Sequence, residues 1–311
     1  MMSCRLLRRA VLVLLFAAQL SGCGVKLVYN NLDRFARWNM SDYVDLNDEQ
    51  RAYFDAEMAA LLYWHRTHHL PEYADLLETL PTTFSDCADL DEIFWISERM
   101  FVWYEQLEAR LVPIAVEMML SLEDAQVAEL PRRLERDNEE LEEEETDLDP
   151  AAIAERWQRE YSDGFKRLVG RLTREQKAYL AAQSVDYIPQ YALWADYRRR
   201  WQREILKLIA EDRDDPEVFA QKFQALVDAR IPVYYGEELT EVFKLNERQY
   251  QEVTVWMINS LTPEQQERLK ERLLELAEDF RELRAEAALE APPQPLRPLS
   301  SASSSSSQAT R

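Results

Sequence analysis

Glycine is scarce in this chain, and its scarcity limits the folds that the chain can adopt. Only five of the 311 residues are glycine, and two of them, Gly22 and Gly24, flank a cysteine near the amino terminus. Tight β-hairpin turns and phosphate-binding loops depend on glycine, because a Cβ blocks the backbone conformations or close approaches that they need. The sequence therefore argues against Rossmann and P-loop folds and favours long helices.

Apolar residues recur at helical spacing in three long segments. Between Ile93 and Met118 they step at intervals of seven, four and three residues, and shorter seams run from Phe54 to Leu61 and from Leu269 to Leu283. This spacing is typical of amphipathic helices, and no comparable stretch alternates with a period of two. We therefore predict an all-α fold, an elongated multi-helix bundle, with kinks or breaks at Pro113 and Pro189.

The amino terminus has the layout of a lipoprotein signal peptide. Arginines at positions 5, 8 and 9 precede an apolar run from Ala10 to Leu20. The run is too short to stay in a membrane as a spanning helix, which takes about 20 residues. It leads directly into a lipobox made of Leu20, Ser21, Gly22 and Cys23. The alternative is an ordinary cleaved signal with a coincidental cysteine.

The lipobox predicts cleavage after residue 22 and attachment of diacylglycerol and an N-acyl chain, such as palmitate, to Cys23. Several chains make a stable anchor, because each buried methylene contributes about 0.8 kcal/mol. Gly24 stands where inner-membrane lipoproteins of enterobacteria carry a retention aspartate. By resemblance to that sorting rule, we expect the outer membrane, with the protein facing the periplasm.

Charge and cysteine content narrow the possible partners. Without residues 1–22, the chain has 34 basic and 58 acidic residues, a formal charge of 34 − 58 = −24. This balance argues against nucleic acid as a partner, because binding the phosphate backbone needs a basic stripe. Cys4 leaves with the signal peptide and Cys23 is acylated, so Cys87 has no internal partner and the fold depends on its core.

Four segments share a helix-start pattern, in which a glutamine follows a leucine by four residues. They are Leu46 to Gln50, Leu122 to Gln126, Leu172 to Gln176 and Leu261 to Gln265. Asn47, Thr173 or Thr262 can cap the first amides of its helix, and the glutamine three residues on can reach back to the amide of the cap residue. Each glutamine is therefore expected to mark a helix start.

The second and fourth of these segments also belong to longer similar stretches. Residues 116–130 align with residues 255–269 at a constant offset of 139. An ancient duplication into two related halves explains this alignment, and convergence of capped helix starts is the alternative.

These patterns divide the chain into segments. After the signal peptide (1–22) we expect a lipidated, membrane-proximal segment (23–45), an N-terminal helical half (46–138), an acidic linker or solvated helix (139–150), a C-terminal helical half (151–290) and a disordered Pro/Ser-rich tail (291–311). Residues 139–149 carry eight carboxylates in eleven positions, and such a run repels itself. Calcium binding is a weaker interpretation, since the glycine-punctuated alternation of a calcium loop is absent.

The histidines are the main candidates for metal chemistry. All three lie within five residues, at His65, His68 and His69. Positions 65 and 69 share a helix face, to which Glu72 or Asp75 can add an oxygen ligand. The competing interpretation places His65 in a core seam and the other two at the end of a helix that stops at Leu70-Pro71. We predict no resident metal and no cofactor beyond the lipid.

Catalytic groups are not recognisable in the sequence. No nucleophile stands with a histidine outside the single cluster, and Cys87 has no evident activating partner. A stripe of aromatic residues at helical spacing allows a peptide or glycan groove, but core packing is the better interpretation; its members are Tyr187, Tyr191, Trp194, Tyr197 and Trp201. We therefore expect a protein that is not an enzyme.

Several short motifs resemble an uncharacterised family of proteobacterial lipoproteins, a domain-of-unknown-function family. They are the lipobox, Tyr29-Asn30-Asn31, Asp42 to Leu46, Gln50, Trp64-His65-Arg66 and Leu70 to Tyr73. The resemblance covers most of the mature chain and implies a helical, lipid-anchored protein without an assigned activity. A weaker likeness, through Leu-Thr-x-x-Gln at 172–176 and 261–265, is to the periplasmic stress proteins CpxP and Spy.

We therefore expect a non-enzymatic outer-membrane lipoprotein that binds other proteins of the cell envelope. One alternative is an ATP-independent periplasmic chaperone, as the likeness to CpxP and Spy implies. The other is a metal-binding protein that uses His65, His68 and His69.

Overall fold

The computed structural model describes residues 23–85, 87–146, 149–293, 296 and 299. Within these residues there are eleven α-helices and no strands, which confirms the all-α prediction. The helices are α2 (Cys23–Tyr29), α3 (Leu32–Ser41), α4 (Asp48–Thr83), α5 (Leu90–Leu120), α6 (Asp124–Thr146), α7 (Pro150–Val169), α8 (Arg174–Gln183), α9 (Tyr191–Asp212), α10 (Pro216–Asp228), α11 (Gly236–Asn259) and α12 (Pro263–Leu289), with a 3-10 turn η1 (Ser184–Asp186) and a π-helical segment η2 (Arg230–Tyr235).

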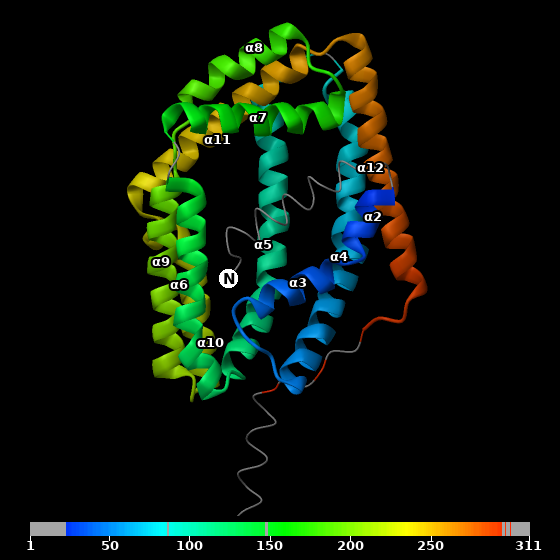
Figure 1. Cartoon of the computed structure of the whole chain (residues 1–311). Helices are drawn as coiled ribbons and strands as arrows, with labels where there is room; N and C mark the ends of the chain where they lie inside the picture. Colours follow the sequence, from blue (N-terminus) through cyan, green and yellow to red (C-terminus); the bar gives the residue numbers. More distant parts are fainter. Residues whose placement is uncertain (1–22, 86, 147–148, 294–295, 297–298, 300–311) are drawn as a thin grey trace, which may run out of the picture.

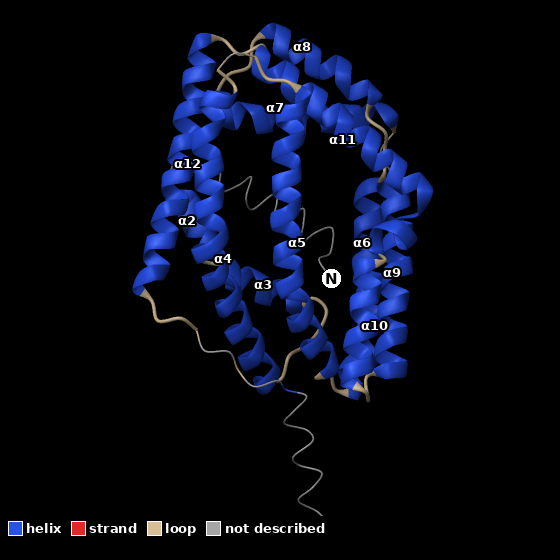
Figure 2. Ribbon diagram, turned by 180° about the vertical axis from the view of Figure 1, so that it is seen from behind, coloured by secondary structure: helices blue, strands red, loops and turns tan. Residues whose placement is uncertain are grey.

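The helices are arranged as a frame. Figure 1 shows α4 and α12 side by side as one column and α6, α9 and α10 as another, with α7, α8 and α11 crossing one end. Helix α5 runs between the two columns, which the view from behind also shows (Figure 2). Because α4 packs against α12 and α6 packs against α9, segments from both halves of the sequence build each column.

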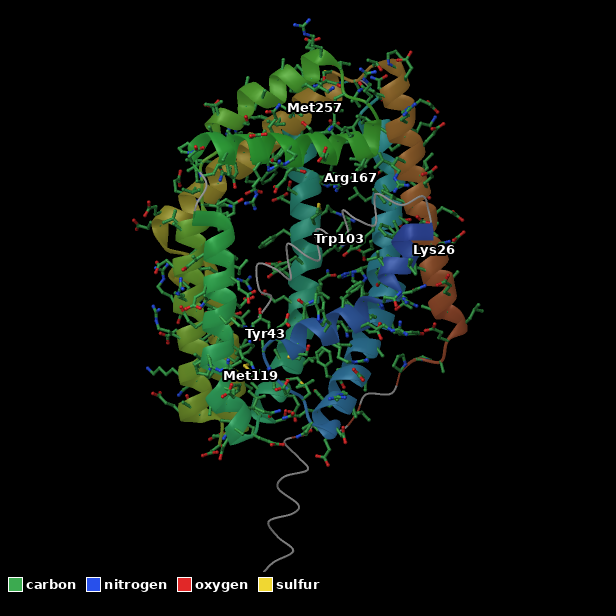
Figure 3. All side chains as sticks on the ribbon, in the orientation of Figure 1. Lys26, Tyr43, Trp103, Met119, Arg167 and Met257 are labelled. Carbon is green, nitrogen blue, oxygen red and sulfur yellow. The ribbon has the colours of Figure 1, made fainter. Side chains whose placement is uncertain are left out.

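Apolar side chains hold the two columns and the crossing end together. The largest buried cluster joins α9 and α10 to α5 and α6, around Ile205, Phe219 and Phe223. A second cluster joins α7, α8 and α11, where Leu180 and Met257 are fully buried (Figure 3). Burying a side chain of this size contributes roughly 1.5–3 kcal/mol, so these clusters are a main source of stability for the frame.

The predicted aromatic stripe lies mostly in the core. Tyr197 and Trp201 are buried in the largest cluster, and Trp194 packs against it. Tyr187 instead packs against the cluster at the crossing end. Core packing is therefore the correct interpretation for these residues.

Two of the three prolines for which a break was expected lie inside helices that continue past them. The expectation that a helix stops at Leu70-Pro71 is wrong, because α4 continues to Thr83. Leu70 and Ala74 on either side of the proline are almost completely buried, and α4 packs along α12 here, so tertiary packing outweighs the lost backbone hydrogen bond. Pro113 likewise leaves α5 unbroken, whereas Pro189 lies in the break before α9 as predicted.

The acidic run continues a helix. Residues 139–146 form the last turns of α6, and residues 147 and 148 lie outside the described part of the chain. Asp149 caps α7, since its side chain accepts a hydrogen bond from the amide of Ala152. The predicted signal peptide with Leu20, Ser21 and Gly22 of the lipobox, and most of the predicted tail, also lie outside the described residues.

Candidate functional site

The four leucine–glutamine motifs form helix starts, as the sequence predicts. Asn47, Thr173 and Thr262 each accept a hydrogen bond from the amide of the glutamine three residues on, and that glutamine accepts one from the amide of the cap residue. In the second motif, Gln126 accepts a hydrogen bond from the amide of Glu123. All four helices therefore begin with a glutamine oxygen turned toward the backbone.

The four glutamines lie in two pairs, and each pair connects two helix starts. Gln50 donates to Gln126 at 2.9 Å, and Gln126 donates back at 2.8 Å. Each amide also donates to the backbone of the opposite segment, Gln50 to the carbonyl of Ser121 and Gln126 to that of Asp45. We call this the first glutamine junction.

The second glutamine junction repeats this geometry in the carboxy-terminal half. Gln176 and Gln265 donate to each other at 2.9 and 3.0 Å. Their amides also donate to the carbonyls of Ser260 and Arg171, respectively. Because both side chains are almost completely buried, this exchange satisfies polar atoms that water cannot reach.

A chain of hydrogen bonds that passes through His65 and His69 joins three helices, α2, α4 and α5. Tyr29 Oη lies 2.6 Å from His65 Nδ1, and Tyr73 Oη lies 3.3 Å from both His65 Nε2 and His69 Nδ1. The chain ends at Gln106 of α5, whose Oε1 lies 2.9 Å from His69 Nε2. In one consistent assignment, Tyr29, His65, Tyr73 and His69 each donate a hydrogen bond to the next group.

Burial keeps His65, Tyr73 and Tyr29 in their neutral forms. Desolvation, followed by the nearby His69, lowers the pKa of His65 from 6.5 to about 3. Desolvation together with Glu72 raises the pKa of Tyr73 to about 12, and desolvation also raises the pKa of Tyr29. These three groups are therefore neutral at physiological pH.

The residues named as possible metal ligands do not converge on one point. His68 is exposed and its Nδ1 lies 3.0 Å from the carbonyl of Trp64. Glu72 accepts a hydrogen bond from the Trp103 ring at 2.6 Å, and Asp75 pairs with Arg281. Across the described ranges, there is no group of three His, Cys, Asp or Glu residues placed to hold a metal ion.

The segment after Cys23 is folded onto the body of the protein. Helix α2 begins at Cys23, and Tyr29 packs between α4 and α12 against Leu70 and Leu283. Lys26, labelled in Figure 3, forms an ion pair with Glu282 and lies 4.0 Å from Asp279. The segment that was predicted to be membrane-proximal is therefore held in place from its first turn, by contacts that the sequence pattern did not reveal.

An exposed apolar surface covers the amino-terminal part of α5. We call it the α5 apolar surface; it consists of Leu90, Phe94, Trp95, Met100, Phe101 and Val102, with exposed fractions between 37% and 60%. The predicted seam is thus wrong at Met100, which is the most exposed of the six, although both ends of the seam, Ile93 and Met118, are buried. Figure 1 shows that this part of α5 stands between the two columns.

The fold and these features define an all-α protein in which four of the described helices, α4, α6, α8 and α12, start at paired glutamine junctions. Residues 42–237, more than half of the chain, match a family of unknown function (DUF6279). The chain therefore belongs to this family. Comparison with curated proteins and with solved structures gives no match. No helix in the described part of the chain is long and apolar enough to cross a membrane.

Proposed function

We propose that this protein is an outer-membrane lipoprotein that faces the periplasm and binds another protein of the cell envelope, without catalysing a reaction. The α5 apolar surface carries this proposal. Six large apolar side chains lie exposed within thirteen positions of one helix, from Leu90 to Val102. Large apolar side chains that gather at the surface in this way mark binding sites, because water disfavours them until a partner covers them.

The composition of the surface suits a protein partner. Two phenylalanines, a tryptophan and a methionine belong to residue types that are enriched at the centres of protein interfaces. Charged side chains lie among these residues: Glu98 and Glu105 are exposed, and the Arg99 guanidinium lies 5.8 Å from the ring of Trp95.

The proposed anchor rests on the lipobox and on the structure that follows it. The only cofactor in this proposal is the lipid on Cys23. Because α2 begins at that residue and packs on α4 and α12, the acyl chains would hold the folded body next to the membrane. Metabolic labelling with palmitate tests the anchor: label in the wild type and its loss in Cys23→Ser are expected. Label that persists in the variant would contradict it.

Site-specific photo-crosslinking in intact cells tests the binding role. A photoreactive amino acid at Phe101 should capture one dominant envelope protein, identified by mass spectrometry. The same amino acid at Leu245 is the matched control, because Leu245 lies on α11 and is about as exposed. No adduct at Phe101 above the Leu245 control would contradict the proposal.

An ATP-independent chaperone is the second candidate, favoured by the exposed apolar side chains on α5, which suit unfolded clients. The same crosslinking experiment separates the two candidates. A broad set of unfolded envelope proteins captured at Phe101 would identify a chaperone, whereas a single protein across replicates would identify a dedicated partner.

A further inference from the structure

A second group of exposed apolar side chains lies on the two helices that follow Cys23 in the sequence. Leu27 on α2 and Phe35 and Trp38 on α3 have exposed fractions between 40% and 62%. Arg34 and Phe35 lie four and three residues before Trp38, so both neighbour Trp38 on the surface of α3. We call these four residues, Leu27, Arg34, Phe35 and Trp38, the anchor-proximal surface.

The helices that carry this surface are fixed to the body. The Tyr29 hydroxyl lies 2.6 Å from His65 Nδ1, and Arg66 donates to Asn30 at 2.7 Å. On α3, Arg37 forms an ion pair with Asp55 of α4 at 2.7 Å. A lipid on Cys23 is therefore followed by a docked segment and not by a free tether, and Leu27 lies only one helical turn beyond it, about 6 Å along the axis.

The charge of this segment is opposite to that of the rest of the protein. Residues 23–41 contain three basic residues and one acidic residue, Asp33, a net charge of 3 − 1 = +2. The mature chain carries 34 − 58 = −24, so the remainder carries 31 − 57 = −26. Because Lys26 and Arg37 form ion pairs with carboxylates of the body, the exposed Arg34 is the cation that this segment presents to an anionic headgroup.

We infer that the anchor-proximal surface lies on the lipid bilayer, with Phe35 and Trp38 at the level of the headgroups. Tryptophan favours this region because one part of its ring system is apolar and its N–H is polar. An amphipathic helix with a basic edge binds a bilayer parallel to its plane. This inference rests on the proposed lipidation of Cys23, and it adds a second contact that sets how the body is oriented on the membrane.

Spin labelling of the full-length lipoprotein in vesicles tests this inference. Cys87→Ser removes the exposed native thiol, and a nitroxide is then attached at Phe35→Cys, Trp38→Cys or the control Leu245→Cys. Collision rates with oxygen, which enters lipid, and with a polar nickel chelate, which stays in water, are measured in vesicles of phosphatidylethanolamine and phosphatidylglycerol. We expect an oxygen-to-nickel ratio several-fold higher at positions 35 and 38 than at 245.

The outcomes separate this inference from the anchor on which it rests. Intact-mass analysis reports whether Cys23 carries acyl chains. If the protein is acylated but the oxygen-to-nickel ratios at positions 35 and 38 match that of the control, the membrane contact is overturned and the anchor is not. The surface would then be assigned to a protein partner. Protein without acyl chains would overturn both. Because both labelled side chains are exposed, circular dichroism should show unchanged helix content in the variants.

Discussion

Gln176 and Gln265 hydrogen-bond to each other in both directions, although 89 residues separate them in the chain. Each oxygen also accepts a hydrogen bond from the amide of its own cap residue, and each nitrogen also donates to a carbonyl of the opposite segment. At this single buried point, the two glutamines thus satisfy backbone groups of two helix starts and each other's polar atoms. Removing one member takes one hydrogen-bond partner from each buried polar atom of the other.

Alanine substitution in this junction is expected to be destabilising and strongly non-additive. Gln176→Ala or Gln265→Ala should each lower the free energy of unfolding by roughly 1–3 kcal/mol, because the buried amide that remains loses its hydrogen bonds to the removed side chain. The double variant should cost less than the sum of the two, since the hydrogen bonds between the two side chains are lost only once. Urea unfolding of the four proteins measures this coupling.

The exposed Gln224 is the control for these variants. Its side chain donates to Asp228 on the surface of α10, so Gln224→Ala should change stability by less than about 0.5 kcal/mol. Strictly additive costs for Gln176→Ala and Gln265→Ala would contradict the reciprocal hydrogen bonds.

Sequence reasoning identified the helix starts but not their pairing. Capping is local, because Thr173 and Gln176 are three residues apart, so a short motif predicts it. One partner of Gln176 across the junction is the carbonyl of Ser260, which is 84 residues away in the chain. Only the tertiary fold brings the two groups together. The histidines show the same limit of local patterns. They are neighbours in the sequence, whereas their hydrogen-bond partners Tyr29 and Gln106 come from α2 and α5.

The exposure of side chains along α5 could not be predicted from the local sequence pattern either. Apolar spacing predicts that one face of a helix is buried, but not how much of the helix its neighbours cover. At Met118 another cluster closes over the face, whereas at Met100 the side chain stays exposed. The features that support a binding function are therefore those that depend on the arrangement of helices.

His65 should make the protein less stable as the pH falls from about 6.5 toward 3. In this window the unfolded chain binds a proton at His65, and the folded protein, with a pKa lowered to about 3, does not. The free energy of unfolding therefore falls with decreasing pH, by up to about 1.4 kcal/mol per pH unit from this group. In His65→Gln this contribution is absent, so urea unfolding at pH 7, 6 and 5 should show a shallower decline.

His68→Gln is the matched control for this pH dependence. His68 is exposed and lies on the same helix, so the variant should keep the wild-type slope. If His65→Gln and His68→Gln decline equally with pH, His65 does not stay neutral in the folded protein.

Two glycine substitutions are expected to have opposite effects. Gly170 ends α7 with φ of 79°, and an added Cβ would lie 2.7 Å from the Arg268 Nη1 atom, so Gly170→Ala should destabilise by about 1–2 kcal/mol. Gly164 lies inside α7, where a Cβ meets no atom within 4 Å, and Gly164→Ala should stabilise by about 0.5–1 kcal/mol. Thermal unfolding gives both signs, and two shifts in the same direction would refute the prediction.

Tyr29→Phe should loosen α2 without unfolding the frame. The substitution keeps the ring between α4 and α12 but removes the hydroxyl beside His65, so a partly buried nitrogen loses its partner at a cost of about 1–3 kcal/mol. Hydrogen exchange followed by mass spectrometry should show faster exchange in α2 and unchanged protection in α8, which belongs to a separate apolar cluster. Tyr63→Phe on α4 is the control and should leave α2 protected. Unchanged exchange in α2 of Tyr29→Phe would mean that the ion pair of Lys26 and apolar packing alone hold the segment after Cys23 in place.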